Sequence, residues 1–371
     1  MMSDTKKAGG TVMMSPSQFM LGAALMIAAL ILGRDLLIPL AVAVVLWYLI
    51  NALAQAIGRP WGKSKQWRLP RWLALVSAFV VIGFCVFMIG RIVSSNVAAV
   101  AAAAPHYQAN LDSALGQLSV FTSERFGTPL PDFGQLARGL DLKVAVRGLV
   151  DSLGGLAGDA GLIFIYLAFL FLEQRSFDSK LRALYPHADR QNKVRRLLHQ
   201  IAMQTQAYVR VKTLIAVLSS ALSFVLLKMV GVDYASFWAL VIFLMSFIPT
   251  IGALVGVLFP ALLALVQFPE PLAPFLIVLV GLGAVQAITG NMLEPALMGK
   301  SLNQSTLVIL LSLAFWGSIW GVAGMFLCTP LTGIAMIICS HFPQTKWIAV
   351  LLSSDGRIVS NDAEPVSIPK P

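Results

Sequence analysis

The residues best suited to chemistry lie in NMLEPALMGKSLNQS, residues 291–305, between two long apolar runs. Asn291 and Glu294 are three residues apart, so an α-helix would present the amide and the carboxylate on one face. Pro295 can end that helix and free backbone carbonyls beside them, and Gln286 lies in the preceding apolar run. Such a group suits a cation, a proton or a hydroxyl-rich solute. The alternative is an ordinary loop with one solvated glutamate.

Composition places these residues in a membrane protein. Of the 371 residues, 58% are hydrophobic and only 12% are charged, which is about half the charged fraction of a water-soluble domain. The net charge of +10 therefore reports the orientation of membrane segments, and nucleic acid is not an expected partner. We predict an all-α polytopic membrane protein with about eight transmembrane helices. Broken or re-entrant helices are expected at 235–268 and 305–340.

Hydropathy and charge divide the chain into seven segments. In chain order they are a disordered tail (1–17), the first three transmembrane helices (18–92), a soluble helical extracytoplasmic insert (93–155), a fourth transmembrane helix (156–172), a basic cytoplasmic amphipathic loop (173–212), a C-terminal transmembrane bundle (213–342) and a polar C-terminal tail (343–371).

Basic residues set the predicted orientation. Residues 58–71 carry five Lys or Arg and no acid, and residues 173–212 carry nine Lys or Arg against three acids. Short basic loops mark the cytoplasmic side of a membrane, so both segments are expected there. Gly33-Arg34-Asp35 is predicted to join the first two spans in a tight helical hairpin. The alternative is a cleaved signal peptide ending near residue 32.

Two apolar runs are too long for one crossing. Residues 235–268 number 34, against the roughly 20 that a bilayer core requires. Proline removes a backbone donor and clashes one turn back, so Pro249 predicts a broken helix or hairpin, with two full spans as the alternative. The run 305–340 contains the glycine-rich stretch GSIWGVAG. The predicted breaks or gating positions are Pro249, Gly252, Gly256, Pro295, Gly317, Gly321 and Gly324. Small residues at such spacing also serve close helix packing, which is the alternative explanation.

Motifs of enzymes and metal sites are absent from the sequence. It contains no GxSxG, HExxH or CxxC pattern and no GxxxxGK[ST] phosphate-binding loop. We therefore expect neither catalysis, nor a metal, nor a cofactor, nor an ATP motor within this chain.

The order of motifs resembles the autoinducer-2 exporter (AI-2E) family of bacterial permeases, which includes PerM-like permeases. The specific matches are FIPTIGALVGVLFPALLAL, the N-x-x-E-P-x-x-M-G-K stretch and the closing G-x-x-G-M-x-L-x-x-P-L. The resemblance covers about residues 15–345, while the N-terminal spans and the insert match only in layout. Ser305 stands where family members typically have proline, which affects only the start of the following helix.

The resemblance implies a multi-pass secondary transporter of the bacterial inner membrane that exports a small polar solute, with autoinducer-2 as the candidate. In this mechanism the breaks at 249–256 and 317–324 gate a polar path by alternating access, and Glu294 binds the coupling cation or proton. The resemblance also implies a homo-oligomer in the lipid bilayer, with five copies as the number it suggests. Two alternatives remain: a Na⁺(Li⁺)/H⁺ antiporter, and a non-transporting membrane scaffold acting through the 93–155 insert.

Overall fold

The computed structural model describes residues 16–57, 70, 73–84, 86–88, 90–92, 95, 159–268, 272–298 and 303–356. Within this part of the chain every regular element is helical, which confirms the all-α prediction. The predicted N-terminal tail, basic loop 58–71, insert 93–155 and last residues of the C-terminal tail lie wholly or almost wholly outside it. The labelled elements are α1 (Pro16–Leu32), α2 (Arg34–Ile57), α6 (Ala160–Leu184), α7 (Ala188–Val230), α8 (Ala235–Met245), α9 (Ile251–Gln267), α10 (Ala273–Gln286), the π-helix η1 (Ala287–Leu293), α11 (Glu294–Met298), α12 (Thr306–His341) and α13 (Lys346–Leu352).

Several helices are long and apolar enough to cross a bilayer. Five qualify within the described residues, and six if the two parts of α6, which meet at an angle of 66°, form one broken span. The qualifying helices are Arg34–Ile57, Leu73–Ile92, Ala188–Val230, Ala273–Met298 and Thr306–His341. The chain is therefore a multi-pass membrane protein, and the full number of crossings remains a prediction.

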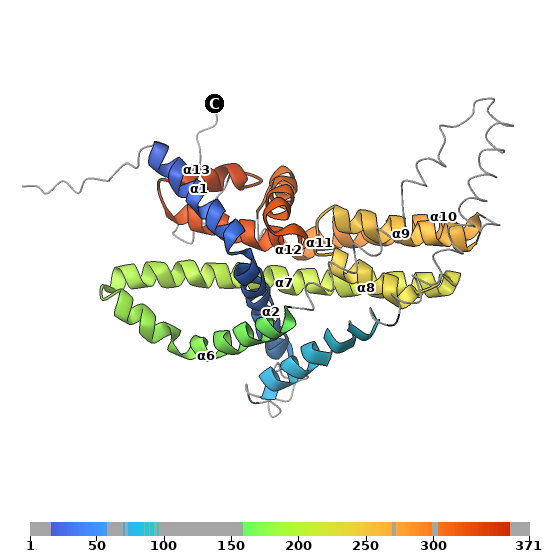
Figure 1. The fold of residues 1–371 in the computed structure, drawn as a ribbon, viewed down its shortest axis with the longest axis horizontal. Coiled ribbons are helices and arrows are strands. Elements are labelled where there is room, and N and C mark those ends of the chain that lie inside the picture. The colour runs from blue at the N-terminus through green and yellow to red at the C-terminus, as the bar shows by residue number, and fades with distance from the viewer. Residues whose placement is uncertain are drawn as a thin grey trace, which may run out of the picture.

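The predicted hairpin at Gly33-Arg34-Asp35 is not formed. The Gly33 amide donates to the carbonyl of Ala29, and the Leu37 amide donates to the carbonyl of Gly33, both at 2.9 Å. Helical hydrogen bonding thus continues through the junction, and α2 runs on from α1 instead of folding back (Figure 1). Polar residues alone do not reverse a helix when no proline or left-handed residue interrupts the bonding.

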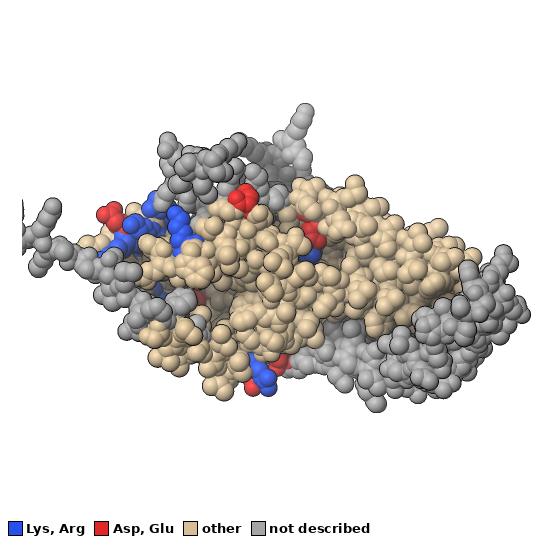
Figure 2. Space-filling view, turned by 90° about the horizontal axis from the view of Figure 1, so that it is seen from above, with Lys and Arg blue, Asp and Glu red and all other residues tan. Residues whose placement is uncertain are grey.

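Helix α7 continues through the predicted boundary between the cytoplasmic loop 173–212 and the C-terminal transmembrane bundle. It is a single helix of 43 residues, about 65 Å long at 1.5 Å per residue. Its first half carries most of the predicted cytoplasmic loop 173–212, and its second half is the following apolar span. An ion pair of 3.2 Å between Arg195 and Asp178 links α7 to α6 near their turn. Charged side chains gather at the end of the molecule that holds this turn and are sparse elsewhere on the visible face (Figure 2).

Helices α8 and α9 form a hairpin, which confirms the predicted break at Pro249. The turn spans residues 246–250, and Thr250 adopts a left-handed φ of 62°. The two outer ends are tied together, because the Gln267 side chain donates to the carbonyl of Gly231 at 2.9 Å and accepts from the Asp233 amide at 2.8 Å. With 11 residues, α8 is about 16 Å long, which is too short to cross the roughly 30 Å core of a bilayer by itself.

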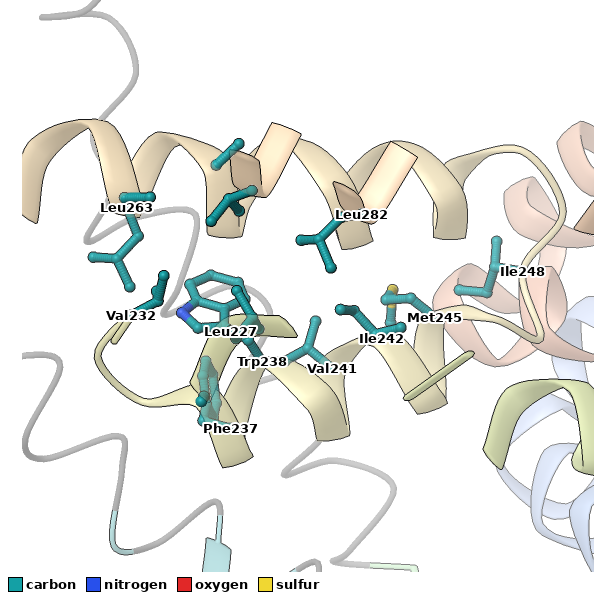
Figure 3. Close-up of a cluster of buried hydrophobic side chains, with 14 of the residues drawn as sticks. Leu227, Val232, Phe237, Trp238, Val241, Ile242, Met245, Ile248, Leu263 and Leu282 are labelled. Carbon is teal, nitrogen blue, oxygen red and sulfur yellow. The ribbon is translucent and has the colours of Figure 1, made fainter. Parts of the chain in front are cut away.

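The core of the C-terminal bundle lies between the α8–α9 hairpin and its neighbours α7 and α10. Large apolar side chains interlock there (Figure 3), including Phe237, Trp238 and Ile242 of α8 and Leu282 of α10. Gly252 allows the hairpin to close, since a Cβ atom at this position would lie 1.8 Å from the carbonyl oxygen of Met245. The hairpin is thus packed on both sides and held as a defined unit.

The long helix α12 is broken at Gly321, as the glycine-rich stretch predicts. Gly321 has φ 61° and ψ −140°, a conformation that only glycine adopts readily. The two arms approach closely, because a Cβ at Gly324 would lie 1.9 Å from the Trp316 carbonyl oxygen and one at Gly317 would lie 3.0 Å from the Met325 side chain. Gly321 is therefore the break, and Gly317 and Gly324 permit the contact around it.

The C-terminal region contains structure that its polarity does not predict. Residues 346–352 of the predicted polar tail form α13. The segment after α13 is joined to residues 303–305 by an isolated antiparallel bridge between Gln304 and Ser353 and by a bond of 2.7 Å from the Asn303 side-chain amide to the Asp355 carboxylate. The chain that follows Glu294 is thereby anchored to the C-terminal segment.

Candidate functional site

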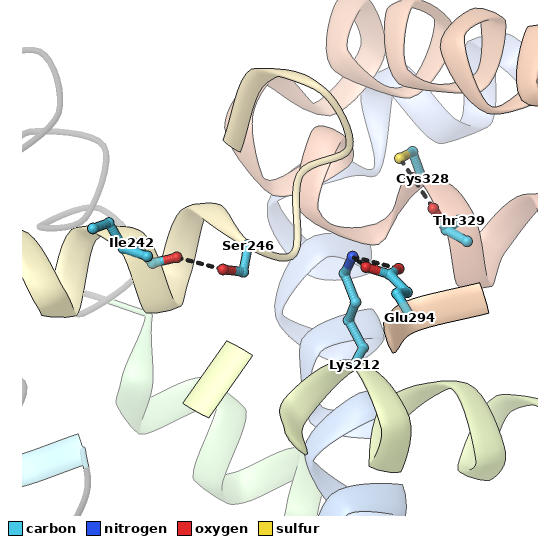
Figure 4. A network of polar contacts seen from close by, with 6 residues as sticks. All are labelled: Lys212, Ile242, Ser246, Glu294, Cys328 and Thr329. Carbon is cyan, nitrogen blue, oxygen red and sulfur yellow. Dashed lines mark hydrogen bonds and ion pairs between the residues drawn. The ribbon is translucent and has the colours of Figure 1, made fainter. Parts of the chain in front are cut away.

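A largely buried ion pair joins α7 to Glu294, the carboxylate of the polar stretch 291–305. The Lys212 ammonium contacts both carboxylate oxygens of Glu294, at 2.6 and 2.8 Å (Figure 4). The side chains are 8% and 22% exposed, respectively. Two oppositely charged groups held at this distance in a mostly apolar bundle leave neither charge unpaired.

The depth of this pair follows from the length of α7. Residues 212 and 230 are 18 positions apart, which corresponds to about 27 Å along the helix. The hydrocarbon core of a bilayer is about 30 Å thick. If the Gly231 end of α7 marks one membrane face, the ion pair lies close to the opposite face, where the charged half of α7 begins.

A π-helix places Glu294. Residues 287–293 form η1, and the Glu294 amide donates to the carbonyl of Thr289, five residues earlier. Thr289 is 1% exposed, and its hydroxyl donates to the Val285 carbonyl at 2.7 Å. Short π-helical insertions are rare and occur frequently at functional sites. Here the insertion rotates Glu294 toward α7.

The π-helix also separates Asn291 from Glu294. The i→i+5 bonding widens the turn, so residues three apart do not lie on one face as they would in an α-helix. Asn291 is exposed, whereas Glu294 is partly buried. Pro295 does not end the helix, because α11 continues to Met298. The predicted grouping of Asn291 with Glu294 on one helical face is therefore not present in this conformation.

Gln286 lies apart from the ion pair, on the side of α10 that faces α9. Its side-chain nitrogen would be 3.2 Å from a Cβ atom at Gly256. Gly256 thus makes room for a polar side chain between two helices and is not a break in α9. The role of both residues in a solute path remains a prediction.

Two broken helices meet beside the ion pair. Phe247, in the turn of the α8–α9 hairpin, stacks on Phe326 of α12 with ring centroids 4.6 Å apart. Figure 4 shows the hairpin turn and the Thr329 region of α12 around Lys212 and Glu294. Tyr208 is 3% exposed, and its hydroxyl, beside Thr329, has no well-formed hydrogen bond within the described residues. The contact between the two broken helices therefore lies close to the ion pair.

Lys212 is the candidate site residue that the sequence pattern did not identify. It was counted with the basic residues of the cytoplasmic loop, and its partner lies 82 positions away in the chain. One sequence feature could have identified it. Lys212 is the last charged residue before the apolar run 213–227, and a lysine buried at the start of a membrane segment needs an acidic partner.

The site does not resemble a preformed metal centre. Within the described ranges no group of three or more His, Cys, Asp or Glu side chains lies close enough to hold an ion. Both oxygens of Glu294 are engaged by Lys212, so a cation would have to displace the ammonium.

Comparisons with known proteins agree with the motif order. The family model described as "AI-2E family transporter" matches residues 20–344. The AI-2 transport protein TqsA of Escherichia coli is 28% identical over 327 residues, covering 86% of this chain and 90% of that protein. A Haemophilus influenzae protein named "Putative transport protein" is 28% identical over 328 residues, covering 85% and 91%. The E. coli "Putative permease PerM" matches only 60 residues, at 35% identity.

Proposed function

Because the chain belongs to the AI-2E family of transporters, we propose that it is a secondary transporter that exports a small polar solute across the bacterial inner membrane. Autoinducer-2 is the first solute to test, since the relative from E. coli is named as an AI-2 transport protein. We propose no catalytic role. The family resemblance further suggests a homo-oligomer, with five copies as the number to test.

The observation that carries the proposal is the buried Lys212–Glu294 pair at the meeting point of two broken helices. In a membrane, broken helices are tolerated where they are packed in protein or line a polar path, and transporters place their binding sites beside such breaks. Buried ionisable groups in membrane proteins are costly and usually serve function, and this pair is only 8% and 22% exposed although it lies close to one membrane face. The pair is therefore the best candidate for a gate.

The chemistry of the pair indicates what can open it. Breaking a buried ion pair is unfavourable unless other groups satisfy both charges. A hydroxyl-bearing solute can donate to the Glu294 carboxylate and accept from the Lys212 ammonium at once. A monovalent cation can replace the ammonium on Glu294 but leaves Lys212 without a partner. This asymmetry favours solute export over Na⁺(Li⁺)/H⁺ exchange.

The test measures release of autoinducer-2 from loaded proteoliposomes, with and without imposed proton and sodium gradients. We expect gradient-dependent release by the wild type and its loss in Glu294→Gln. The matched control is Arg195→Gln, which removes an ion pair whose side chains are 50% and 70% exposed; it should retain release.

Other results of the same assay would change the proposed solute or the proposed function. No release above protein-free liposomes by the folded wild type would exclude autoinducer-2 as the solute. Proton flux driven by a sodium gradient, and lost in Glu294→Gln, would instead support the antiporter. Full release by Glu294→Gln would contradict the gating role of the pair.

A further inference from the structure

Two serines of α7 are buried without a hydrogen-bond partner. Ser219 is 1% exposed and Ser223 is 0% exposed, and neither hydroxyl is bonded within the part of the chain that the structure describes. The adjacent Ser220 differs, because its hydroxyl donates to the Ala239 carbonyl of α8 at 2.7 Å. Buried polar groups in native proteins nearly always have a partner, and an exception needs an explanation.

Ser219 and Ser223 face the helix formed by α10, η1 and α11. They lie on the same face of α7 as Lys212 and Leu226, because offsets of 7, 11 and 14 residues return close to the same angle on an α-helix. Lys212 binds α11, and the Leu226 side chain lies 2.9 Å from where a Cβ of Gly281 in α10 would be. The two serines lie between these contacts, on the face of α7 that packs against the same partner helix.

The contact between these helices is closely packed around the two serines, which are 1% and 0% exposed. A side chain with almost no accessible surface has no neighbouring space for a water molecule, which needs a polar and sufficiently large cavity. The two serine hydroxyls therefore have no hydrogen-bond partner within the described residues. A second conformation that wets this face would satisfy them.

The partner helix contains an element suited to such a change. The π-helix η1, residues 287–293, lies between the Gly281 contact and the Glu294 contact, opposite the serine segment of α7. A π-helical insertion is bonded i→i+5, whereas an α-helix is bonded i→i+4. A return to α-helical bonding would rotate Glu294 relative to Lys212.

We propose that α7 and the α10–η1–α11 helix separate during transport, and that Ser219 and Ser223 then line a water-filled passage that binds a small hydroxylated solute beside the Lys212–Glu294 pair. This inference rests on the proposed transport function. The passage is uncharged, because residues 213–227 and 273–293 contain no Asp, Glu, Lys or Arg. Its hydroxyls suit a neutral solute with hydroxyl groups, whereas an ion would meet no opposite charge there.

The test places cysteine at each position and measures its reaction with a permanently charged methanethiosulfonate, which modifies thiols only in water. Ser219→Cys and Ser223→Cys are compared with Ser220→Cys in proteoliposomes, at rest and while autoinducer-2 is exported under the imposed gradient. Peptide mass spectrometry reports modification at each position, so the native Cys85, Cys328 and Cys339 can remain.

We expect labelling of positions 219 and 223 to rise about tenfold or more from rest to turnover, as when a minor conformation becomes dominant. Position 220 should remain unlabelled in both states. The proposed passage is wrong if positions 219 and 223 are not labelled in variants that still export. It is also wrong if all three positions are labelled equally.

The two proposals fail in different ways. If Glu294→Gln abolishes export but positions 219 and 223 never react, the passage is wrong and the transport function stands. If both positions react under the gradient but no autoinducer-2 is released, the passage stands and that solute is excluded.

Discussion

The two sides of the ion pair should respond differently to mutation, because they differ in burial. Glu294→Gln leaves the Lys212 ammonium, in a side chain that is 8% exposed, without an anion. An uncompensated buried charge of this kind costs about 3–5 kcal/mol of folding free energy. Lys212→Met leaves the Glu294 carboxylate, which is 22% exposed and can partly hydrate, so we expect a smaller loss of about 1–3 kcal/mol.

The double variant Lys212→Met/Glu294→Gln removes both charges together. We expect it to be less destabilised than the sum of the single variants by at least about 1 kcal/mol, as for residues in direct contact. The assay is unfolding by a denaturing detergent in mixed micelles, followed by tryptophan fluorescence. The reasoning is refuted if Lys212→Met is the more harmful change, or if the two single effects simply add.

Three further predictions follow from individual contacts. Gly252→Ala should be strongly destabilising, because its Cβ would lie 1.8 Å from the Met245 carbonyl oxygen. Gly283→Ala is the control: its Cβ would meet nothing within 4 Å, so it should stabilise α10 by about 0.5–1 kcal/mol. Thermal unfolding measures the stability of both variants. Gln267→Ala removes both bonds that tie the ends of the α8–α9 hairpin, so hydrogen exchange in α8 should quicken while that of α6 stays unchanged. Asn303→Ala loses the bond to the C-terminal segment and should make that segment cleavable by a protease at concentrations that leave the wild type intact.

The sequence is informative where apolar length and backbone chemistry decide the structure. The 34-residue run 235–268 exceeds one span, and Pro249 removes a backbone donor near its middle, so the hairpin could be predicted. The same reasoning applies to Gly321, whose left-handed φ of 61° is accessible mainly to glycine. Both breaks are local properties of a few residues.

Features that depend on packing could not be predicted in this way. No residue pattern predicts the π-helix at 287–293. Its wider turn changes the angle between the Asn291 and Glu294 side chains around the helix axis. Lys212 is paired with an acid 82 positions away, and spacing within one helix carries no information on that contact. Helical bonding also continues from α1 into α2, and α7 is one uninterrupted helix, although the charged residues in both segments suggested that a helix ends there. Charged residues alone do not end a helix.

The central claim is that α7 and the α10–η1–α11 helix must separate for export, and a disulfide staple tests it most directly. A Cβ at Gly281 would lie 3.5 Å from the Leu226 side-chain branch point, so cysteines at both positions approach the geometry of a disulfide. Autoinducer-2 release is measured for Leu226→Cys/Gly281→Cys, oxidised and then reduced, with Leu226→Cys alone as control. We predict no release by the oxidised double variant and recovery on reduction. Export at the same rate in both states, with the disulfide confirmed by peptide mass, would contradict the account.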